Sequence, residues 1–153
     1  MKTEPYMIEK TYKAPLERVW NALTDIREMK SWYFDIPDFM PVPGFEFRFV
    51  SGPDESRQYV HLCQVTEVIP GKKIAYTWRY EGYEGNTLVS FELFDQHGMT
   101  RLKLTHEGLE SFPQDNPDFS RERFEEGWSW IIGTVLKMYV EKPVNRQSQS
   151  SYK

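Results

Sequence analysis

Apolar and polar residues alternate in six separate runs of the chain. In one of them, the aromatic residues Phe45, Phe47 and Phe49 take every second position. The residues between them, Glu46 and Arg48, are charged. Such alternation is typical of a β-strand with one buried and one solvated face, and short turns between the runs favour an antiparallel order. We therefore predict strands over residues 6–12, 45–50, 59–69, 73–80, 88–94 and 100–107.

A different spacing marks the last part of the chain. Between residue 119 and Pro143, apolar residues return every three or four positions, and charged residues lie between them. This is the period of an α-helix with one apolar side, so residues 119–142 are predicted to form one long helix. Its apolar stripe, which would pack against the sheet, consists of Phe124, Trp128, Ile131, Ile132, Val135, Met138 and Tyr139.

Two shorter helices are predicted between the first and the second strand. Pro15 suits the first turn of a helix, where its missing N–H needs no partner, and apolar residues follow it at helical spacing. Thr24 or Asp25 can cap a second helix that runs to about residues 32–34. Prolines and Gly44 indicate a loop after it, and glycine-rich or proline-rich stretches indicate a turn at 51–56 and a loop at 108–118.

The order of these elements defines the fold class. One strand, two short helices, five strands and a long helix predict an α+β protein, in which a curved six-stranded antiparallel sheet wraps around the C-terminal helix. We expect residues 1–142 to form a single domain, because 153 residues is the length of one domain and the chain shows no repeat. The polar residues 143–153 are expected to be a flexible tail.

Charge and composition argue against several classes of partner. The formal net charge of -4 disfavours nucleic acid, since binding to phosphates needs clustered cations. No run is apolar and long enough to predict membrane insertion, and the first ten residues contain no apolar segment of a secretion signal. Cys63 is the single cysteine, which excludes an internal disulfide, fits a cytoplasmic protein and is expected to be a small buried residue.

The residue types that most often perform catalysis form no recognisable motif. Ser90 and Ser129 lack the flanking glycines of a nucleophile turn. The three histidines lack the spacing of metal ligands, so we expect neither a metal nor a cofactor. We favour a protein that is not an enzyme. The alternative, an acid–base role of His61, His106 or Glu67 toward a hydrophobic substrate, stays open.

Aromatic residues make up 16% of the chain, which is an unusually high share. Large rings fill space with little loss of rotamer freedom, so they suit either a solid core or a ligand pocket. Composition does not separate these two arrangements. We predict that a set of residues from different elements converges between the sheet and the long helix and lines a ligand site: Trp32, Phe34, Phe47, His61, Tyr76, Trp78, Phe91, His106, Phe124, Trp128 and Ile132.

Several local motifs also resemble those of a known superfamily. They are APLERVWNALTD from residue 14, KSWYF from 30, PGFEFRF from 43, VTEVIPGKKIAYTW from 65, VSFEL from 89, TRLKLTHEGL from 100 and LKMYVEK from 136. In this order they are similar to the START-related (SRPBCC) helix-grip superfamily. Within it, they resemble bacterial proteins similar to the C-terminal domain of the activator of the ninety-kilodalton heat-shock-protein ATPase. The resemblance implies a helix-grip fold whose cavity serves many ligands and a few chemistries.

Two positions depart from the pattern of that family. Pro43 stands before Gly44 where the family usually has two glycines. Cys63 stands where the family usually has a glycine, and its side chain could fill part of a cavity.

Together, these observations leave three hypotheses for function. We favour a non-enzymatic helix-grip protein that binds an apolar or amphipathic small molecule in its central cavity. The resemblance implies a chaperone-linked interaction protein as an alternative, and an enzyme that acts on a hydrophobic substrate is the third hypothesis. An exposed sheet edge and the aromatic residues between positions 32 and 39 could also support a homodimer.

Overall fold

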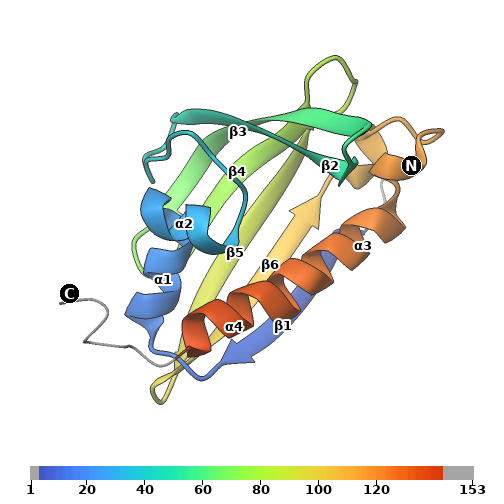
Figure 1. The fold of residues 1–153 in the computed structure, drawn as a ribbon. Coiled ribbons are helices and arrows are strands. Elements are labelled where there is room, and N and C mark those ends of the chain that lie inside the picture. The colour runs from blue at the N-terminus through green and yellow to red at the C-terminus, as the bar shows by residue number, and fades with distance from the viewer. Residues whose placement is uncertain (1–3, 143–153) are drawn as a thin grey trace.

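Six antiparallel strands form one curved sheet, and the C-terminal helix lies along its concave side (Figure 1). The computed structural model describes residues 4–142, so the predicted tail lies outside the described residues. The sheet has the order β1-β6-β5-β4-β3-β2, which confirms the predicted meander and leaves β1 and β2 at its edges. The strands are β1 (Tyr6–Tyr12), β2 (Glu46–Asp54), β3 (Arg57–Ile69), β4 (Lys73–Tyr80), β5 (Thr87–Gln96) and β6 (Met99–Glu107).

Two short helices follow the first strand, as predicted. Helix α1 covers Leu16–Thr24 and helix α2 covers Ile26–Trp32. Pro15 is the N-cap of α1, one position before the first helical residue. Asp25 caps α2, because its side chain accepts hydrogen bonds from the backbone N–H groups of Arg27 and Glu28.

The C-terminal helix is built from three segments rather than one regular α-helix. Helix α3 (Arg121–Trp130) continues into the π-helical turn η3 (Ile131–Val135) and then into α4 (Leu136–Glu141). Two short 3-10 turns, η1 (Leu109–Ser111) and η2 (Pro117–Phe119), occupy the loop before it. No helix within residues 4–142 is long and apolar enough to cross a membrane.

The π-helical turn changes which side chains of this helix face the sheet. The buried residues follow one another at steps of four: Phe124, Trp128, Ile132, Leu136 and Val140. In a regular α-helix such a row drifts around the axis, because one turn contains 3.6 residues. The wider π turn counters part of this drift. Met138, which we placed in the apolar stripe, is 70% exposed, so that part of the prediction is wrong.

The hairpin of β2 and β3 is longer than the alternation predicts. We expected a turn at 51–56, but β2 continues through Gly52 and Pro53 to Asp54, with a register shift between Ser51 and Asp54. A proline is tolerated here because β2 is an edge strand, where its missing N–H interrupts no ladder. Gly52 lies so close to the backbone of Arg57 that a side chain would not fit.

Two of the side chains that hold the C-terminal helix against the rest of the fold are Tyr12 and Arg18. The hydroxyl of Tyr12 in β1 donates a hydrogen bond to the carbonyl of Ile132 in the π turn at 2.7 Å. The guanidinium of Arg18 in α1 donates to the carbonyls of Val140 and Tyr139, at 2.7 and 2.8 Å. Carbonyls at a helix C-terminus lack intrahelical donors, so Arg18 supplies the partners that the end of α4 needs.

Candidate functional site

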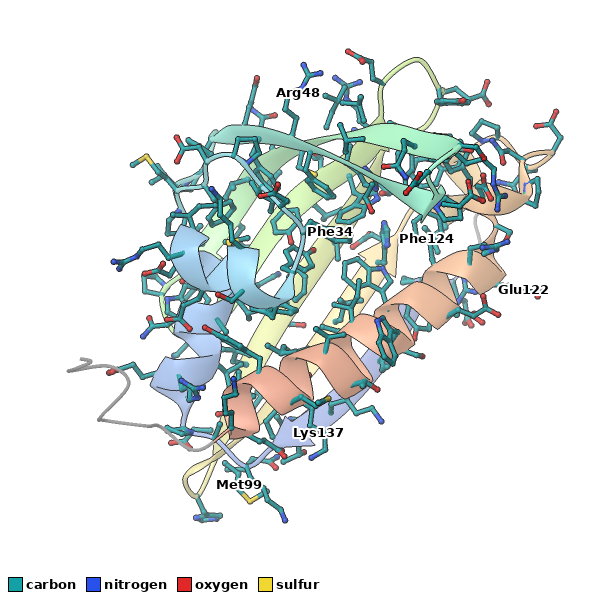
Figure 2. All side chains as sticks on the ribbon, in the orientation of Figure 1. Phe34, Arg48, Met99, Glu122, Phe124 and Lys137 are labelled. Carbon is teal, nitrogen blue, oxygen red and sulfur yellow. The ribbon has the colours of Figure 1, made fainter. Side chains whose placement is uncertain are left out.

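The predicted site residues gather between the concave side of the sheet and the C-terminal helix. Phe34 enters this region from the connection after α2, and Phe124 enters it from α3 (Figure 2). Phe34 is half-buried. The other ten are buried: Trp32, Phe47, His61, Tyr76, Trp78, Phe91, His106, Phe124, Trp128 and Ile132.

Aromatic rings form a continuous path through this region. Phe34 stacks on Phe49 with a centroid distance of 4.5 Å, and Phe49 stacks on His61 at 4.4 Å. Trp78 meets the edge of His61 at 5.2 Å, and it meets Trp128 of the helix at 5.4 Å. These are the separations at which aromatic pairs attract one another. The path therefore connects the molecular surface at Phe34 with the helix at Trp128.

His106 joins the helix to three strands by hydrogen bonds. The indole Nε1 of Trp128 donates to His106 Nδ1 at 3.0 Å. His106 Nε2 lies 2.8 Å from the hydroxyl of Thr87, and that hydroxyl donates its hydrogen to the carbonyl of Trp78 at 2.6 Å. Because the hydroxyl has one hydrogen, we assign His106 Nε2 as the donor to Thr87. Both ring nitrogens of His106 are therefore occupied.

The environment of both buried histidines keeps them neutral. Burial lowers the pKa of His106 to about 3 and the pKa of His61 to about 4. The physical cause is that a charged imidazolium loses its hydration among apolar rings. His61 Nδ1 lies 3.0 Å from the carbonyl of Tyr59, so the neutral ring donates one hydrogen bond inside the protein.

A pair of tyrosine hydroxyls forms a second polar feature of the interior. The hydroxyls of Tyr33 and Tyr76 lie 2.8 Å apart. Burial raises the pKa of both tyrosines, so the pair is uncharged. Cys63 is 4% exposed, and burial raises the pKa of its thiol as well. Cys63 is thus the small buried residue that we expected, and it occupies space that a glycine would leave empty.

The described structure does not gather the candidate residues into a metal site, and the hydroxyl beside His106, that of Thr87, accepts from the ring and so does not face a base. Within residues 4–142, no group of three or more histidine, cysteine or acidic side chains could hold a metal ion. Glu67, a candidate base, pairs with Lys73 at 3.0 Å, and its side chain is 47% exposed. The hydroxyl of Ser129 lies 3.4 Å from that of Tyr6 in an exposed pair, so its hydrogen-bond partner is not a general base.

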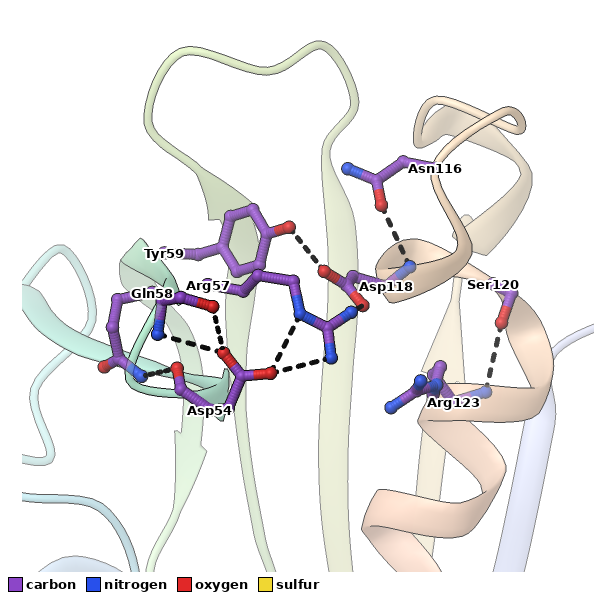
Figure 3. A network of polar contacts seen from close by, with 9 residues as sticks. Asp54, Arg57, Gln58, Tyr59, Asn116, Asp118, Ser120 and Arg123 are labelled. Carbon is purple, nitrogen blue, oxygen red and sulfur yellow. Dashed lines mark hydrogen bonds and ion pairs between the residues drawn. The ribbon is translucent and has the colours of Figure 1, made fainter.

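An ion pair and a hydrogen bond tie the β2–β3 hairpin to the turn η2, just before the C-terminal helix (Figure 3). Arg57, near the hairpin tip, donates to a carboxylate oxygen of Asp118 at 2.8 Å and to Asp54 at 2.9 Å. The hydroxyl of Tyr59 donates to the second oxygen of Asp118 at 2.6 Å. The side chain of Asp118 is only 4% exposed, in contrast to 43% for Arg57. This junction fixes the helix relative to the sheet on one side of the aromatic region.

Several residues of this region were not among the predicted site residues. Phe49 could have been found, because it shares the side of its strand with Phe47. Tyr33 is adjacent to two predicted residues, but a helix end carries no periodic signal that would show its direction. Thr87 had no signal at all, since a threonine at the start of a strand is ordinarily a surface residue.

Comparison with known proteins identifies the family. A family model described as Activator of Hsp90 ATPase homolog 1-like protein matches residues 13–141. No curated protein matches this chain.

Solved structures share the fold. Protein CV1439 from Chromobacterium violaceum is 20% identical, with a TM-score of 0.77 over 92% of this chain and 99% of its own. Protein Mll3558 from Rhizobium loti is 21% identical, with a TM-score of 0.77 over 89% of this chain and 96% of its own. Protein BH1534 from Bacillus halodurans is 23% identical, with a TM-score of 0.70 over 92% and 99%. Since the family model matches nearly the whole described chain, the protein belongs to the family of activator of Hsp90 ATPase homolog 1-like proteins, within the START-related helix-grip superfamily.

Proposed function

We propose that this protein binds an apolar or amphipathic small molecule between its sheet and its C-terminal helix. The observation that carries the proposal is the path of rings from the half-buried Phe34 to the buried Trp128. A molecule that takes the place of Phe34 would contact Phe49 and Trp78, both of which lie against Phe34. Ligand sites are typically lined in this way, by apolar and aromatic side chains with few polar groups.

Access to this region requires the movement of one side chain or of one short connection. Phe34 lies in the connection between α2 and β2. Backbone hydrogen bonds near Phe34 are local turns, from Ile36 to Phe34 and from Val42 to Met40, whereas Gly44 at the end of the connection donates to Val65 of β3 at 2.7 Å. Moving only the part near Phe34 leaves the pairing with β3 intact. A rotation of Phe34 alone is the smallest change that would open the aromatic region to a ligand.

The polar groups of the interior define the chemistry of the ligand. The polar groups along the ring path include His61, Thr87, His106 and the hydroxyls of Tyr33 and Tyr76, and the two histidines are neutral. A charge placed among them would lose its hydration without a partner. The ligand is therefore uncharged inside the protein, or it keeps a charged end at the surface beside Phe34. A hydroxyl or carbonyl of the ligand could meet the paired hydroxyls of Tyr33 and Tyr76.

The same contacts favour binding over catalysis. His106 uses both ring nitrogens within the protein, to Trp128 and to Thr87. Glu67 forms its ion pair on the exposed side of the sheet, so it does not support either histidine. A general acid or base must reach the substrate proton, and neither His106 nor Glu67 is placed to do so.

Mass spectrometry of the freshly purified protein, first native and then denatured, tests this proposal. We expect a specific mass that is lost on denaturation. Titration of the ligand-free protein with N-phenylnaphthylamine, an uncharged fluorescent probe, should give a saturable rise in fluorescence. Phe34→Ala should change the affinity for this probe, since it alters the surface end of the ring path.

Phe94→Ala is the matched control, because Phe94 is an exposed phenylalanine that contacts Arg101 on another part of the surface. Its affinity for the probe should equal that of the unmodified protein. A protein that carries no small molecule and does not bind the probe at any concentration would refute the proposal.

A chaperone-linked interaction is the second candidate function, and the description of the matching family favours it. The exposed side of the C-terminal helix carries Trp130 and Met138, which are 62% and 70% exposed. Exposed apolar side chains of this size are candidates for contact with another protein. The test is the ATPase rate of a purified ninety-kilodalton heat-shock protein with the unmodified chain and with Trp130→Ala. An unchanged rate with the unmodified chain would remove this candidate.

A further inference from the structure

The outer face of the sheet carries a hollow that the proposed function does not use. It has a volume of about 390 Å³ and lies over β2, β3 and β4. We call it the outer groove, and its lining residues are Glu46, Phe47, Arg48, Leu62, Cys63, Gln64, Thr77, Arg79 and Asn86. The side chains of Phe47 and Cys63 are buried, on the other side of their strands from Arg48 and Leu62. Arg48 extends from the sheet away from the C-terminal helix (Figure 2). The outer groove is thus separated from the aromatic region by the sheet itself.

Strand pairing places two arginines on opposite sides of this groove. Arg48 of β2 pairs with Leu62 of β3, and Leu62 pairs with Arg79 of β4. The three residues form one row across neighbouring strands, so the two arginine backbones are about 10 Å apart. Leu62 is half-buried and lies between the two arginines in this row, so it offers an apolar surface between them.

The guanidinium groups of Arg48 and Arg79 have N–H donors that are not engaged in close ion pairs with the described residues. Among residues 4–142, Arg79 makes no ion pair. Arg48 reaches Glu81 only at 4.0 Å, which is too long for a good hydrogen bond. Each arginine offers five N–H donors in a planar arrangement that matches the oxygens of a carboxylate or a phosphate.

The remaining lining residues limit what the groove can bind. The hydroxyl oxygen of Thr77 accepts a hydrogen bond from the backbone N–H of Gln64 at 3.0 Å, which leaves its hydrogen for a ligand. Glu46 lies in the same strand as Arg48 and two positions before it, so it repels a second negative charge. The groove therefore suits a molecule with one anionic end and an apolar part that rests on Leu62.

We propose that the outer groove binds a small organic oxyanion, whose carboxylate or phosphate group is held between Arg48 and Arg79. The site is independent of the interior ligand, since the two lie on opposite faces of the sheet.

Nuclear magnetic resonance of the full chain tests this inference. Benzoate and inorganic phosphate are titrated separately, at an ionic strength held constant with sodium chloride. We expect saturable shifts of the Nε–H signals of Arg48 and Arg79 and of the backbone amide of Leu62. Tighter binding of benzoate would indicate a carboxylate ligand with an apolar body, and tighter binding of phosphate would indicate a phosphate ester.

Two substitutions, one that removes a positive charge from the groove and one that removes a negative charge, make the test more specific. Arg79→Gln should weaken the binding of the better probe about tenfold or more, because it removes a charge-assisted hydrogen bond. Glu46→Gln should strengthen binding, because it removes a repulsive charge. Lys30→Gln is the matched control: Lys30 is an exposed cation on α2, and its loss should leave the affinity unchanged.

Two results would overturn the inference. Shifts that never saturate would show the absence of a site. Equal weakening by Lys30→Gln and Arg79→Gln would show general attraction to surface cations. Binding of N-phenylnaphthylamine to Arg79→Gln, measured in parallel, reports on the interior site alone, so the failure of one proposal is distinguishable from the failure of the other.

Discussion

Acidification below pH 6.5 should destabilise this protein, because its two buried histidines must take up protons when it unfolds. Burial lowers the pKa of His61 to about 4 and of His106 to about 3, whereas a histidine in an unfolded chain has a pKa of about 6.5. A depressed pKa in the folded state means that the fold prefers the neutral ring. Its stabilisation is therefore fully present above pH 6.5, and it is lost as the pH falls toward 4 for His61 and toward 3 for His106.

The size of the effect follows from these values. At about pH 5 the unfolded chain holds about one more proton at each histidine than the folded protein does. Between about pH 6.5, the pKa of an unfolded histidine, and about pH 5 lie about 1.5 pH units. Over this range, one extra proton on the unfolded chain lowers the free energy of unfolding by about 1.4 kcal/mol for each pH unit. The free energy of unfolding should thus fall by about 2 kcal/mol for each histidine and by about 4 kcal/mol for both. This is a large share of the roughly 5–15 kcal/mol that stabilises a typical domain.

Urea titrations followed by tryptophan fluorescence, at about pH 7.5 and about pH 5, measure this difference. His61→Phe keeps a ring that can stack on Phe49 and removes one titrating group. In this variant the loss between the two pH values should shrink from about 4 to about 2 kcal/mol. Asp54, whose pKa is lowered to about 2 by hydrogen bonds from Ser56 and Arg57, adds its own loss only at more acidic pH.

The control is His97→Asn. His97 is exposed, in the turn between β5 and β6, and its positive φ of 56° is one that asparagine tolerates. The His97→Asn variant should show the same pH dependence of the free energy of unfolding as the unmodified protein. If the free energy of unfolding of the unmodified protein falls by less than about 1 kcal/mol between about pH 7.5 and about pH 5, the reasoning is refuted. Such a result would mean that the folded state accommodates protonated histidines. The same conclusion would follow if His61→Phe and the unmodified protein lost equal stability.

Three further predictions concern the contacts that hold the aromatic region together. Tyr12→Phe removes the donor to the buried carbonyl of Ile132 and should lower the free energy of unfolding by about 1–3 kcal/mol, measured by urea titration. Asp118→Asn removes the charge opposite Arg57 and should lower it by about 1–2 kcal/mol, since Arg57 is partly solvated. Cys63 is 4% exposed with a raised pKa, so a chromogenic disulfide reagent should modify it only after unfolding.

Matched variants keep these predictions specific. Tyr6→Phe removes a hydroxyl from an exposed contact of 3.4 Å and should change stability by less than about 0.5 kcal/mol. Arg27→Gln breaks an ion pair in which the arginine side chain is 89% exposed, and it should have an equally small effect. Rapid reaction of the thiol in the native protein would contradict the burial of Cys63.

The elements of the fold could be predicted because their signals are local. The strands at Tyr6–Tyr12 and Lys73–Tyr80 have the bounds that the alternation predicts, since a period of two is a property of neighbouring residues. The error in β2 has an equally physical cause. Gly52 and Pro53 are typical of a turn, and only the edge position of β2 makes them compatible with a strand.

Alternate residues of a strand share a face, so the sequence shows which side chains of a strand point the same way. Which of the two faces is turned inward was left open, because a single bulge reverses it. The structure decides this point: Phe47, Trp78 and Phe91 are buried. The exposure of Met138 could not be predicted, because it depends on the π turn at Ile131–Val135. Nothing in the local spacing of that helix marks such a turn.

The sequence by itself determined the family, the order of the elements and many, though not all, of the rings between sheet and helix. Only the tertiary structure decided what those residues do to one another. The bond from Trp128 to His106 joins positions 22 apart, and the bond from Tyr12 to Ile132 joins positions 120 apart. The row of Arg48, Leu62 and Arg79 likewise exists only once three strands are in register. Hydrogen bonds, ring contacts and charge pairs depend on distances of a few ångströms, and the folded chain sets those distances between residues that no local pattern connects.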